Sequence, residues 1–395
     1  MGSTHATSSL VERSCRSAVG SLLLGWCLLA PSAVRADPED GPSAEGTAAE
    51  APAPAPRSEV AILPAVAYDS ALGVGFGVVA NVARLHPRFT PYKALLEGQL
   101  FLYVGPRPGG GVRVPLQNHW VRLDLPGLLG GRLRVRLRGG LRSQINVGYY
   151  GMGNASENQR PWRALDKTTQ PEAYAAARRR YEYSLTQPYV GAEGLVPLVG
   201  GLKLWASARL WWSFPSAPEG SKLADDLAGA AGSEVVALLA GATRHGVIEG
   251  AVGLVHDSRD HELAPSRGGL HEISVRGGPT IELGSGYGGV HVQTRGWAPL
   301  LGDGLVLGAR LLVDALVGRP PLSELARFGG QTPEFGPGGA VAVRGVPWQR
   351  YHGKIKTIGN VELRAIVLRT PFLGRPAALG VLGFVDLGRV WSDWR

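Results

Sequence analysis

Arginine is the residue of this sequence whose type and spacing point most clearly to chemistry. Arg344 lies between small apolar residues and a glycine in the segment AVRGVPWQRYHG, residues 342–353. A guanidinium is planar and permanently charged, and it binds a carboxylate through two parallel hydrogen bonds. Arg344 therefore indicates ion pairing rather than bond-making chemistry. Upstream, four further arginines alternate with apolar residues in GRLRVRLRGGLR: Arg132, Arg134, Arg136 and Arg138.

The sequence offers no credible catalytic or metal site. It holds no G-x-S-x-G motif, no phosphate-binding glycine loop and no pair of catalytic carboxylates in a suitable setting. Both cysteines, Cys15 and Cys27, lie in an N-terminal targeting segment, so the mature chain has no thiol ligand. We therefore expect no enzyme activity, no cofactor and no bound metal. One cluster has the residue types of a metal site, but it falls in a predicted turn without converging spacing: His256, Asp257, Asp260, His261 and Glu262.

Residues 1–36 have the pattern of an export signal. Arg13 and Arg16 precede the apolar run AVGSLLLGWCLLA, and the tripeptide V-R-A ends the segment with small residues suited to cleavage. A membrane anchor is the alternative, but the apolar run is shorter than the roughly 20 residues needed to span a bilayer. Removing three arginines and one glutamate lowers the formal net charge from +9 to +7. Residues 37–58 are a Pro/Ala/acidic tract that cannot bury a core, so we expect a disordered spacer.

Residues 59–395 are expected to form one all-β domain. No later segment reaches about 18 consecutive apolar residues, which argues against a helical membrane protein. Polar and apolar residues alternate instead, in GRLRVRLRGGLR, KLWASARLWW and HVQTRGW, and successive side chains of a strand point to opposite faces. We predict thirteen strands at residues 60–68, 72–84, 92–104, 112–125, 131–145, 181–195, 200–214, 245–258, 268–279, 287–299, 304–318, 356–371 and 377–392.

Strand and loop lengths favour a membrane barrel over a soluble sandwich, whose strands also alternate. Most predicted strands reach the roughly 9 to 11 residues needed to cross a membrane at a tilt. The three long connections, residues 146–180, 215–244 and 319–355, all follow odd-numbered strands, as the outer loops of such barrels do. We predict a transmembrane antiparallel β-barrel in the outer membrane of a Gram-negative-type bacterium. Its arginine stripe would face the lumen, which disfavours nucleic-acid binding.

Several short motifs follow one another on the predicted strands. They are Val343-Arg344-Gly345, Glu362 with Arg364, Phe384-Val385-Asp386-Leu387-Gly388, the stretch from Tyr149 to Asn154, and the turn from Asp257 to Gly268. In this order and spacing they resemble the barrel domain of the BamA/TamA-type outer-membrane proteins, also called bacterial surface antigens. That superfamily includes the two-partner secretion translocators. The resemblance runs from about residue 59 to the end, and no single motif in it is specific.

The resemblance implies that the sixth outer loop, after strand eleven, folds back and plugs the barrel. Arg344 would then meet Asp386, and Glu362 as a second partner, on the inner wall. Val343 and Gly345 would belong to the loop motif, and Phe384 and Gly388 to the motif of strand thirteen. Removing one partner of an ion pair in a narrow lumen is costly, whereas a solvated loop arginine, the alternative, needs no partner.

Two departures from the family bear on function. The spacer is too short for even one of the periplasmic POTRA domains that receive client proteins in the classical members. The family closes a barrel of sixteen strands, whereas thirteen are predicted here, and an open sheet would leave bare edges in lipid. We therefore expect a C-terminally truncated sequence or gene, or an assembly of several chains.

Two functions of different classes follow. By resemblance, the chain is an assembly or translocation factor, with client polypeptides or a separate periplasmic protein as partner. The alternative is a pore or structural barrel that passes or binds small solutes through an arginine-lined lumen, without assembly activity. Other expected partners are outer-membrane lipid and lipopolysaccharide, whose phosphates suit the run Arg178, Arg179 and Arg180, although a solvated charge run is the alternative.

Overall fold

Thirteen antiparallel strands form one continuous sheet in which every strand pairs with its neighbours in sequence. The computed structural model describes residues 56–394 except 70–71, 88, 108–109, 155–160, 263, 303, 334–335 and 373, so the predicted targeting segment and most of the predicted spacer lie outside it. The strands are β1 (Arg57–Asp69), β2 (Gly73–His86), β3 (Phe89–Pro106), β4 (Val112–Leu128), β5 (Leu133–Gly148), β6 (Glu182–Pro197), β7 (Leu202–Ser216), β8 (His245–Asp257), β9 (Gly268–Ile281), β10 (Ser285–Leu301), β11 (Leu305–Gly318), β12 (Ile355–Phe372) and β13 (Arg375–Trp391).

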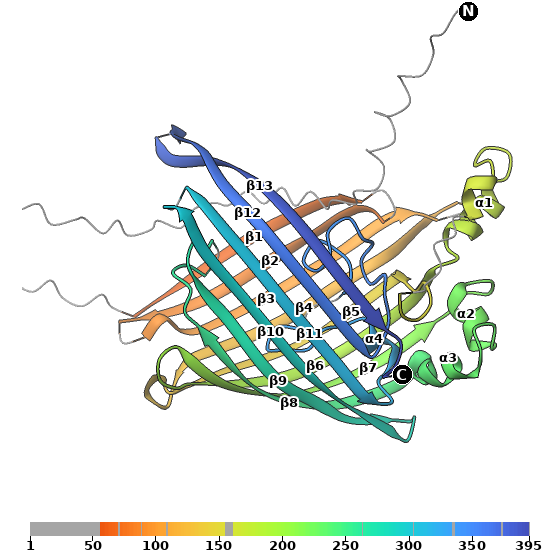
Figure 1. Cartoon of the computed structure of the whole chain (residues 1–395), viewed down its shortest axis with the longest axis horizontal. Coiled ribbons are helices and arrows are strands. Elements are labelled where there is room, and N and C mark those ends of the chain that lie inside the picture. The colour runs from red at the N-terminus through yellow and green to blue at the C-terminus, as the bar shows by residue number, and fades with distance from the viewer. Residues whose placement is uncertain are drawn as a thin grey trace, which may run out of the picture.

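The sheet curls around a central space, and the strands in front cross those behind (Figure 1). In the part of the chain that the structure describes, β1 and β13 are the two edges of the sheet. All thirteen predicted strands are present, each within a few residues of its predicted ends. The predicted all-β antiparallel fold is therefore confirmed.

The two faces of the sheet have the polarity of a membrane barrel. On β9, Ile273 and Val275 point outward and are 53% and 50% exposed, whereas Ser274 and Arg276 point inward and are 4% and 6% exposed. Large apolar side chains are exposed in the same way on the other strands, for example Val190, Leu311 and Val361. This is the reverse of a soluble protein, and it is the arrangement of a wall whose outer face meets hydrocarbon.

The long connections all follow odd-numbered strands, as predicted. Residues 149–181, 217–244 and 319–354 are the long ones, and they follow β5, β7 and β11. They carry four short helices: α1 (Pro171–Arg178), α2 (Lys222–Leu227), α3 (Ser233–Leu238) and α4 (Leu322–Leu325). Across the described ranges no helix is both long enough and apolar enough to cross a membrane.

An apolar core lies where the long connections meet the inner face of the strands. Its members come from the wall and from all three long connections, so the core fixes these connections, α4 included, against the strand ends. The buried members are Val147, Tyr149, Tyr183, Trp211, Leu223, Leu239, Ala242, Val247, Tyr287, Leu316, Leu322 and Leu325.

Candidate functional site: the inner loop and the arginine-lined lumen

The connection between β11 and β12, residues 319–354, lies inside the curled sheet (Figure 1), and we call it the inner loop. Its backbone donates hydrogen bonds to carboxylates of the wall. Gln331 N lies 2.5 Å from Glu272 Oε1 of β9, and Gly329 N lies 2.8 Å from Asp314 Oδ2 of β11. The wall side chains that hold the loop are therefore polar residues on the inward positions of apolar strands.

Arg344 anchors the far part of the inner loop to β12 and β13. Its Nε and Nη2 donate to the two carboxylate oxygens of Asp386 at 2.7 and 2.6 Å, and its backbone N–H donates to Asp386 Oδ2 at 2.9 Å. Nη1 donates to Glu362 at 2.7 Å. The hydrogen bonds to Asp386 raise the pKa of Arg344 above its ordinary value. The guanidinium thus binds Asp386 in a bidentate geometry and reaches Glu362 through a single further hydrogen bond.

The other motif residues lie close to this anchor, on the inner loop or on the strands that it faces. The Arg344 guanidinium lies 3.6 Å from the ring centre of Phe384, and a Cβ on Gly388 would come within 3.2 Å of Val343. Gly345 has φ +81°, a left-handed conformation in which a side chain is strained. The structure therefore brings Val343, Arg344 and Gly345 of the loop beside Glu362, Phe384, Asp386 and Gly388 of the wall.

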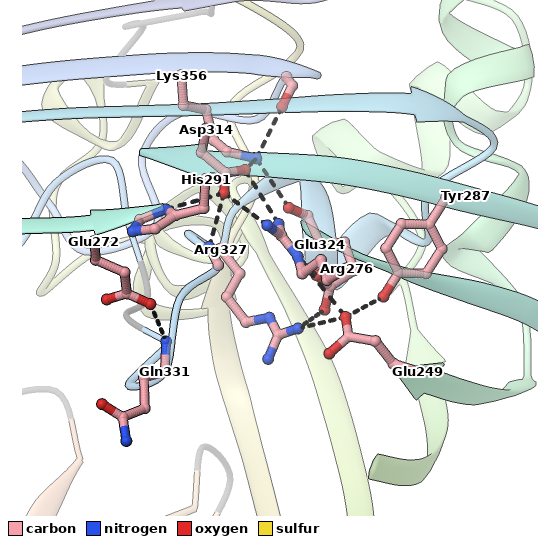
Figure 2. Close-up of polar contacts among 12 residues, drawn as sticks. Glu249, Glu272, Arg276, Tyr287, His291, Asp314, Glu324, Arg327, Gln331 and Lys356 are labelled. Carbon is pink, nitrogen blue, oxygen red and sulfur yellow. Dashed lines mark hydrogen bonds and ion pairs between the residues drawn. The ribbon is translucent and has the colours of Figure 1, made fainter. Parts of the chain in front are cut away.

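A buried charged network joins the base of the inner loop to the wall (Figure 2). At its centre, Asp314 of β11 accepts hydrogen bonds from Arg276 of β9 at 2.7 and 3.1 Å. Lys356 Nζ of β12 lies 3.1 Å from the same carboxylate, and His291 Nδ1 of β10 lies 3.4 Å from it. Four neighbouring strands therefore meet at one carboxylate.

The second carboxylate of the network, Glu249 of β8, receives the inner loop directly. Arg327 of the loop lies 3.2 Å from Glu249 and 2.7 Å from Glu324 of α4. Tyr287 of β10 donates to Glu249 at 2.5 Å. Gly329 of the inner loop lies beside the pair of Asp314 and Arg276, where a Cβ would overlap the Arg276 guanidinium.

Sequence reasoning missed this network. The signal was present, because a lone charged residue interrupts an apolar stretch at inward parity, as Glu249 does in GVIEGAVGL and Asp314 in LLVDALVG. The partners, however, come from strands far apart in the sequence and from a loop without period. Which of these charged residues meet depends on how neighbouring strands are aligned in the sheet, and no local sequence pattern predicts that alignment.

The predicted arginine stripe is present in part. Arg134 and Arg136 on β5 reach Asp124 at 2.5 and 3.4 Å, and Arg138 lies over the ring of Trp120 at 5.1 Å. The prediction was wrong for Arg132, which lies in the turn before β5 rather than on the strand. Gly130 and Gly131 have φ of 69° and 87° and close a tight turn there, so β5 begins at Leu133 rather than at the predicted residue 131.

Several polar residues in and beside the turn between β8 and β9, residues 258–267, have structural partners. Arg259 pairs with Asp257 at 2.8 Å, and the hydroxyl of Ser266 donates to Asp260, which lowers the pKa of Asp260 to about 2. His256 stacks on His271 of β9. No group of three or more metal-ligating side chains occurs among the described residues.

Two of the three arginines proposed for lipopolysaccharide contact other residues of the outer loops. Arg180 pairs with Asp225 of α2 at 2.9 Å, and Arg178 lies 5.4 Å from the ring centre of Trp162. The run therefore helps to tie the first two long loops together.

An open space of about 450 Å³ separates the inner loop from β4, β5, β6 and β7. A smaller space of about 240 Å³ lies beside Arg344. Arginine is the most frequent charged residue in both linings, so the inner loop divides a basic lumen rather than filling it.

Comparison with known proteins finds no matching family model and no matching curated protein. Among solved structures, the chain is similar to BamA from Haemophilus ducreyi lacking POTRA domains 1–3, with 12% identity and a TM-score of 0.49 over 85% of this chain. The matched region covers 58% of that BamA chain, so the present chain spans little more than half its length. Two structures of OmpT, an outer membrane protein of Vibrio cholerae, also align. The loop L8 deletion mutant has 9% identity, TM-score 0.26 and coverage of 67% of this chain and 95% of its own, and the in-vitro folded form has 7%, 0.27, 84% and 94%.

Proposed function

We propose that this chain is an outer-membrane β-barrel whose lumen is closed by the inner loop, and that it belongs to the assembly or translocation class of such proteins. The observation that carries the proposal is the anchor of Arg344, which binds Asp386 through three hydrogen bonds and Glu362 through one. The outward apolar and inward polar faces of the strands support a position in the outer membrane.

The anchor suits a stopper that can be displaced. The Arg344 side chain is 21% exposed and that of Asp386 is 3% exposed, so the pair lies at the edge of open lumen space. A charge-assisted contact of this kind is strong enough to hold a loop, and it is open to competition by an incoming polypeptide or ion.

Conductance in planar lipid bilayers tests the closure. We expect the wild-type chain to give small and rare currents, and Arg344→Ala to raise the open probability because the loop loses its attachment to β12 and β13. Arg319→Ala is the matched control, since it removes the same charge from the exposed start of the inner loop without touching Asp386. Identical traces from wild type and Arg344→Ala would refute the closure.

Activity in assembly needs its own assay. An unfolded outer-membrane β-barrel should fold faster into lipid vesicles that carry this chain than into empty vesicles of the same composition. Equal folding rates in the two vesicle preparations would contradict the assembly class while leaving the closed barrel intact.

The second candidate is a pore or barrel that passes or binds small solutes. The specific observation that favours it is the arginine-lined space of about 450 Å³ beside the inner loop. Large constitutive currents that Arg344→Ala does not change would favour this candidate over a closed barrel.

A further inference from the structure

The space between the inner loop and β4 to β7 has the charge of an anion site. Its carboxylates are Glu193 of β6 and Glu324 of α4. Six arginines line the space, four from β4 and β5, one from β7 and one from the inner loop: Arg122, Arg136, Arg138, Arg142, Arg209 and Arg327. Four of the six are ion-paired, to Glu97, to Asp124 and Glu193, to Glu249, or to Glu249 and Glu324, so the excess positive charge is centred on Arg138.

Several donors in this lining have unused hydrogen-bonding capacity. The Nε–H groups of Arg122, Arg209 and Arg327 are buried and have no acceptor among the described residues. The Arg327 side chain is nine-tenths buried, at 10% exposure. A buried donor without an acceptor costs free energy, and a ligand in the space recovers that cost where these side chains turn their Nε–H groups toward it.

Arg138 is held in place without a carboxylate. Its guanidinium lies 5.1 Å from the ring centre of Trp120 and 5.7 Å from that of Tyr189. No ion pair of Arg138 occurs within the described part of the chain. Two aromatic rings thus fix a cation that faces the open space with its charge uncompensated.

We propose that this space binds a soluble anion that carries phosphate groups. Donors approach from β4, β5, β7 and the inner loop, and the tetrahedral array of phosphate oxygens accepts hydrogen bonds from several directions at once, whereas a planar carboxylate accepts them near one plane. Tyr189 and Trp211, which also line the space, offer apolar surface to an organic part of the ligand. The inference shares with the proposed function the place of the inner loop inside the barrel, and it does not require that the loop blocks ion flow.

The wall separates this site from membrane lipid. The charged lining residues of the strands occupy inward positions, and the alternate residues, for example Leu137, Val190 and Leu204, point outward and are exposed. The sheet from β4 to β7 lies between Arg138 and lipid, and we infer that the ligand enters from the aqueous lumen.

Calorimetric titration tests the site with the mature chain folded in micelles of an uncharged detergent. The probe is inorganic pyrophosphate at constant ionic strength, and we expect saturable binding of one pyrophosphate per chain. Arg138→Gln should weaken binding about tenfold or more, because it removes a charged donor. Its fold should be kept, since no carboxylate loses a partner, and far-UV circular dichroism checks this. Arg84→Gln is the control, because it removes the same charge from an exposed position on β2.

Three results would overturn the proposal. They are the absence of saturable heat with pyrophosphate, equal affinity in wild type and Arg138→Gln, and binding of citrate as tight as that of pyrophosphate at equal ionic strength. None of them depends on ion conduction. Pyrophosphate binding together with unchanged currents in Arg344→Ala would therefore refute the closed barrel and support the anion site. Raised currents in Arg344→Ala without pyrophosphate binding would support the closed barrel and refute the anion site.

Discussion

Asp314 is the residue on which the buried network depends most. Its side chain is 0% exposed and faces Arg276 and Lys356 together. Asp314→Asn keeps the volume and removes the charge, so two buried cations lose their shared partner. We expect a loss of about 3–5 kcal/mol in the free energy of unfolding. Urea titration of the chain folded in lipid vesicles measures it.

A matched substitution separates this effect from the general effect of losing an aspartate. Asp393 pairs with Lys354 at 3.1 Å, but its side chain is 42% exposed. Asp393→Asn should change the free energy of unfolding by about 0–1 kcal/mol. Similar losses in the two variants would show that the network adds no special stability.

His352 of the inner loop predicts a dependence of stability on pH. It is fully buried, its ring lies 5.2 Å from that of Tyr149, and its ring nitrogens have no hydrogen-bond partner among the described residues. Burial, with the nearby charge of Lys356, lowers the pKa of His352 to about 3. Between about pH 6.5 and 3 the unfolded chain therefore binds a proton that the folded chain does not, so this contribution is present at neutral pH and is lost as the pH falls.

His352→Phe should remove that dependence, because phenylalanine keeps a ring against Tyr149 and does not titrate. From pH 7 to 5 we expect the wild-type chain to lose about 2 kcal/mol more than the variant in the free energy of unfolding. Urea titrations at the two pH values give the difference. Parallel losses in both chains would mean that His352 is protonated in the folded state.

The strands are the elements whose outer faces decide between a membrane barrel and a soluble one. Ile273, near the middle of β9, is 53% exposed, and Leu300, near the turn end of β10, is 51% exposed. In lipid, Ile273→Arg should cost about 2–4 kcal/mol and Leu300→Arg about 0–1, because the cost of a charge falls from the midplane to the interface. Unfolding in lipid vesicles measures both. A soluble sheet would tolerate either variant, so equal and small costs would contradict a membrane-spanning wall.

Elements with a strong period were predictable from the sequence, and elements without one were not. Alternation located all thirteen strands, and loop length located the three long connections. The helices α2, α3 and α4 have six, six and four residues, too few for a 3.6-residue period to appear. The predicted arginine stripe shows where alternation fails as a predictor of strand ends. Arg132 continues the alternating pattern in the sequence, but the two glycines before it form a turn, and the strand begins only after Arg132.

The candidate site likewise has residues that the sequence predicted and residues that it did not. A resemblance of motifs led to Arg344, Asp386 and Glu362, which the structure brings within hydrogen-bonding distance. The network around Asp314 needed the register of β8 to β12, which brings Glu249 and Arg327 together across 78 positions of sequence. Long-range register follows from the cooperative pairing of the whole sheet and not from any one segment.

At the scale of the whole molecule, the distribution of apolar surface sets the solvent that the chain requires. Exposed large apolar side chains occur on strands from β1 to β13, from Val60 and Ile62 to Val385 and Leu387. A soluble monomer rarely exposes a contiguous apolar patch larger than a few hundred Å². We expect the mature chain to sediment with outer-membrane vesicles, to resist extraction by alkaline carbonate, and to aggregate when detergent is diluted below its critical micelle concentration. Analytical ultracentrifugation across that concentration measures the transition. A monodisperse monomer in detergent-free buffer would contradict a lipid-facing wall. The proposal of a closed barrel in the outer membrane would then fail as well.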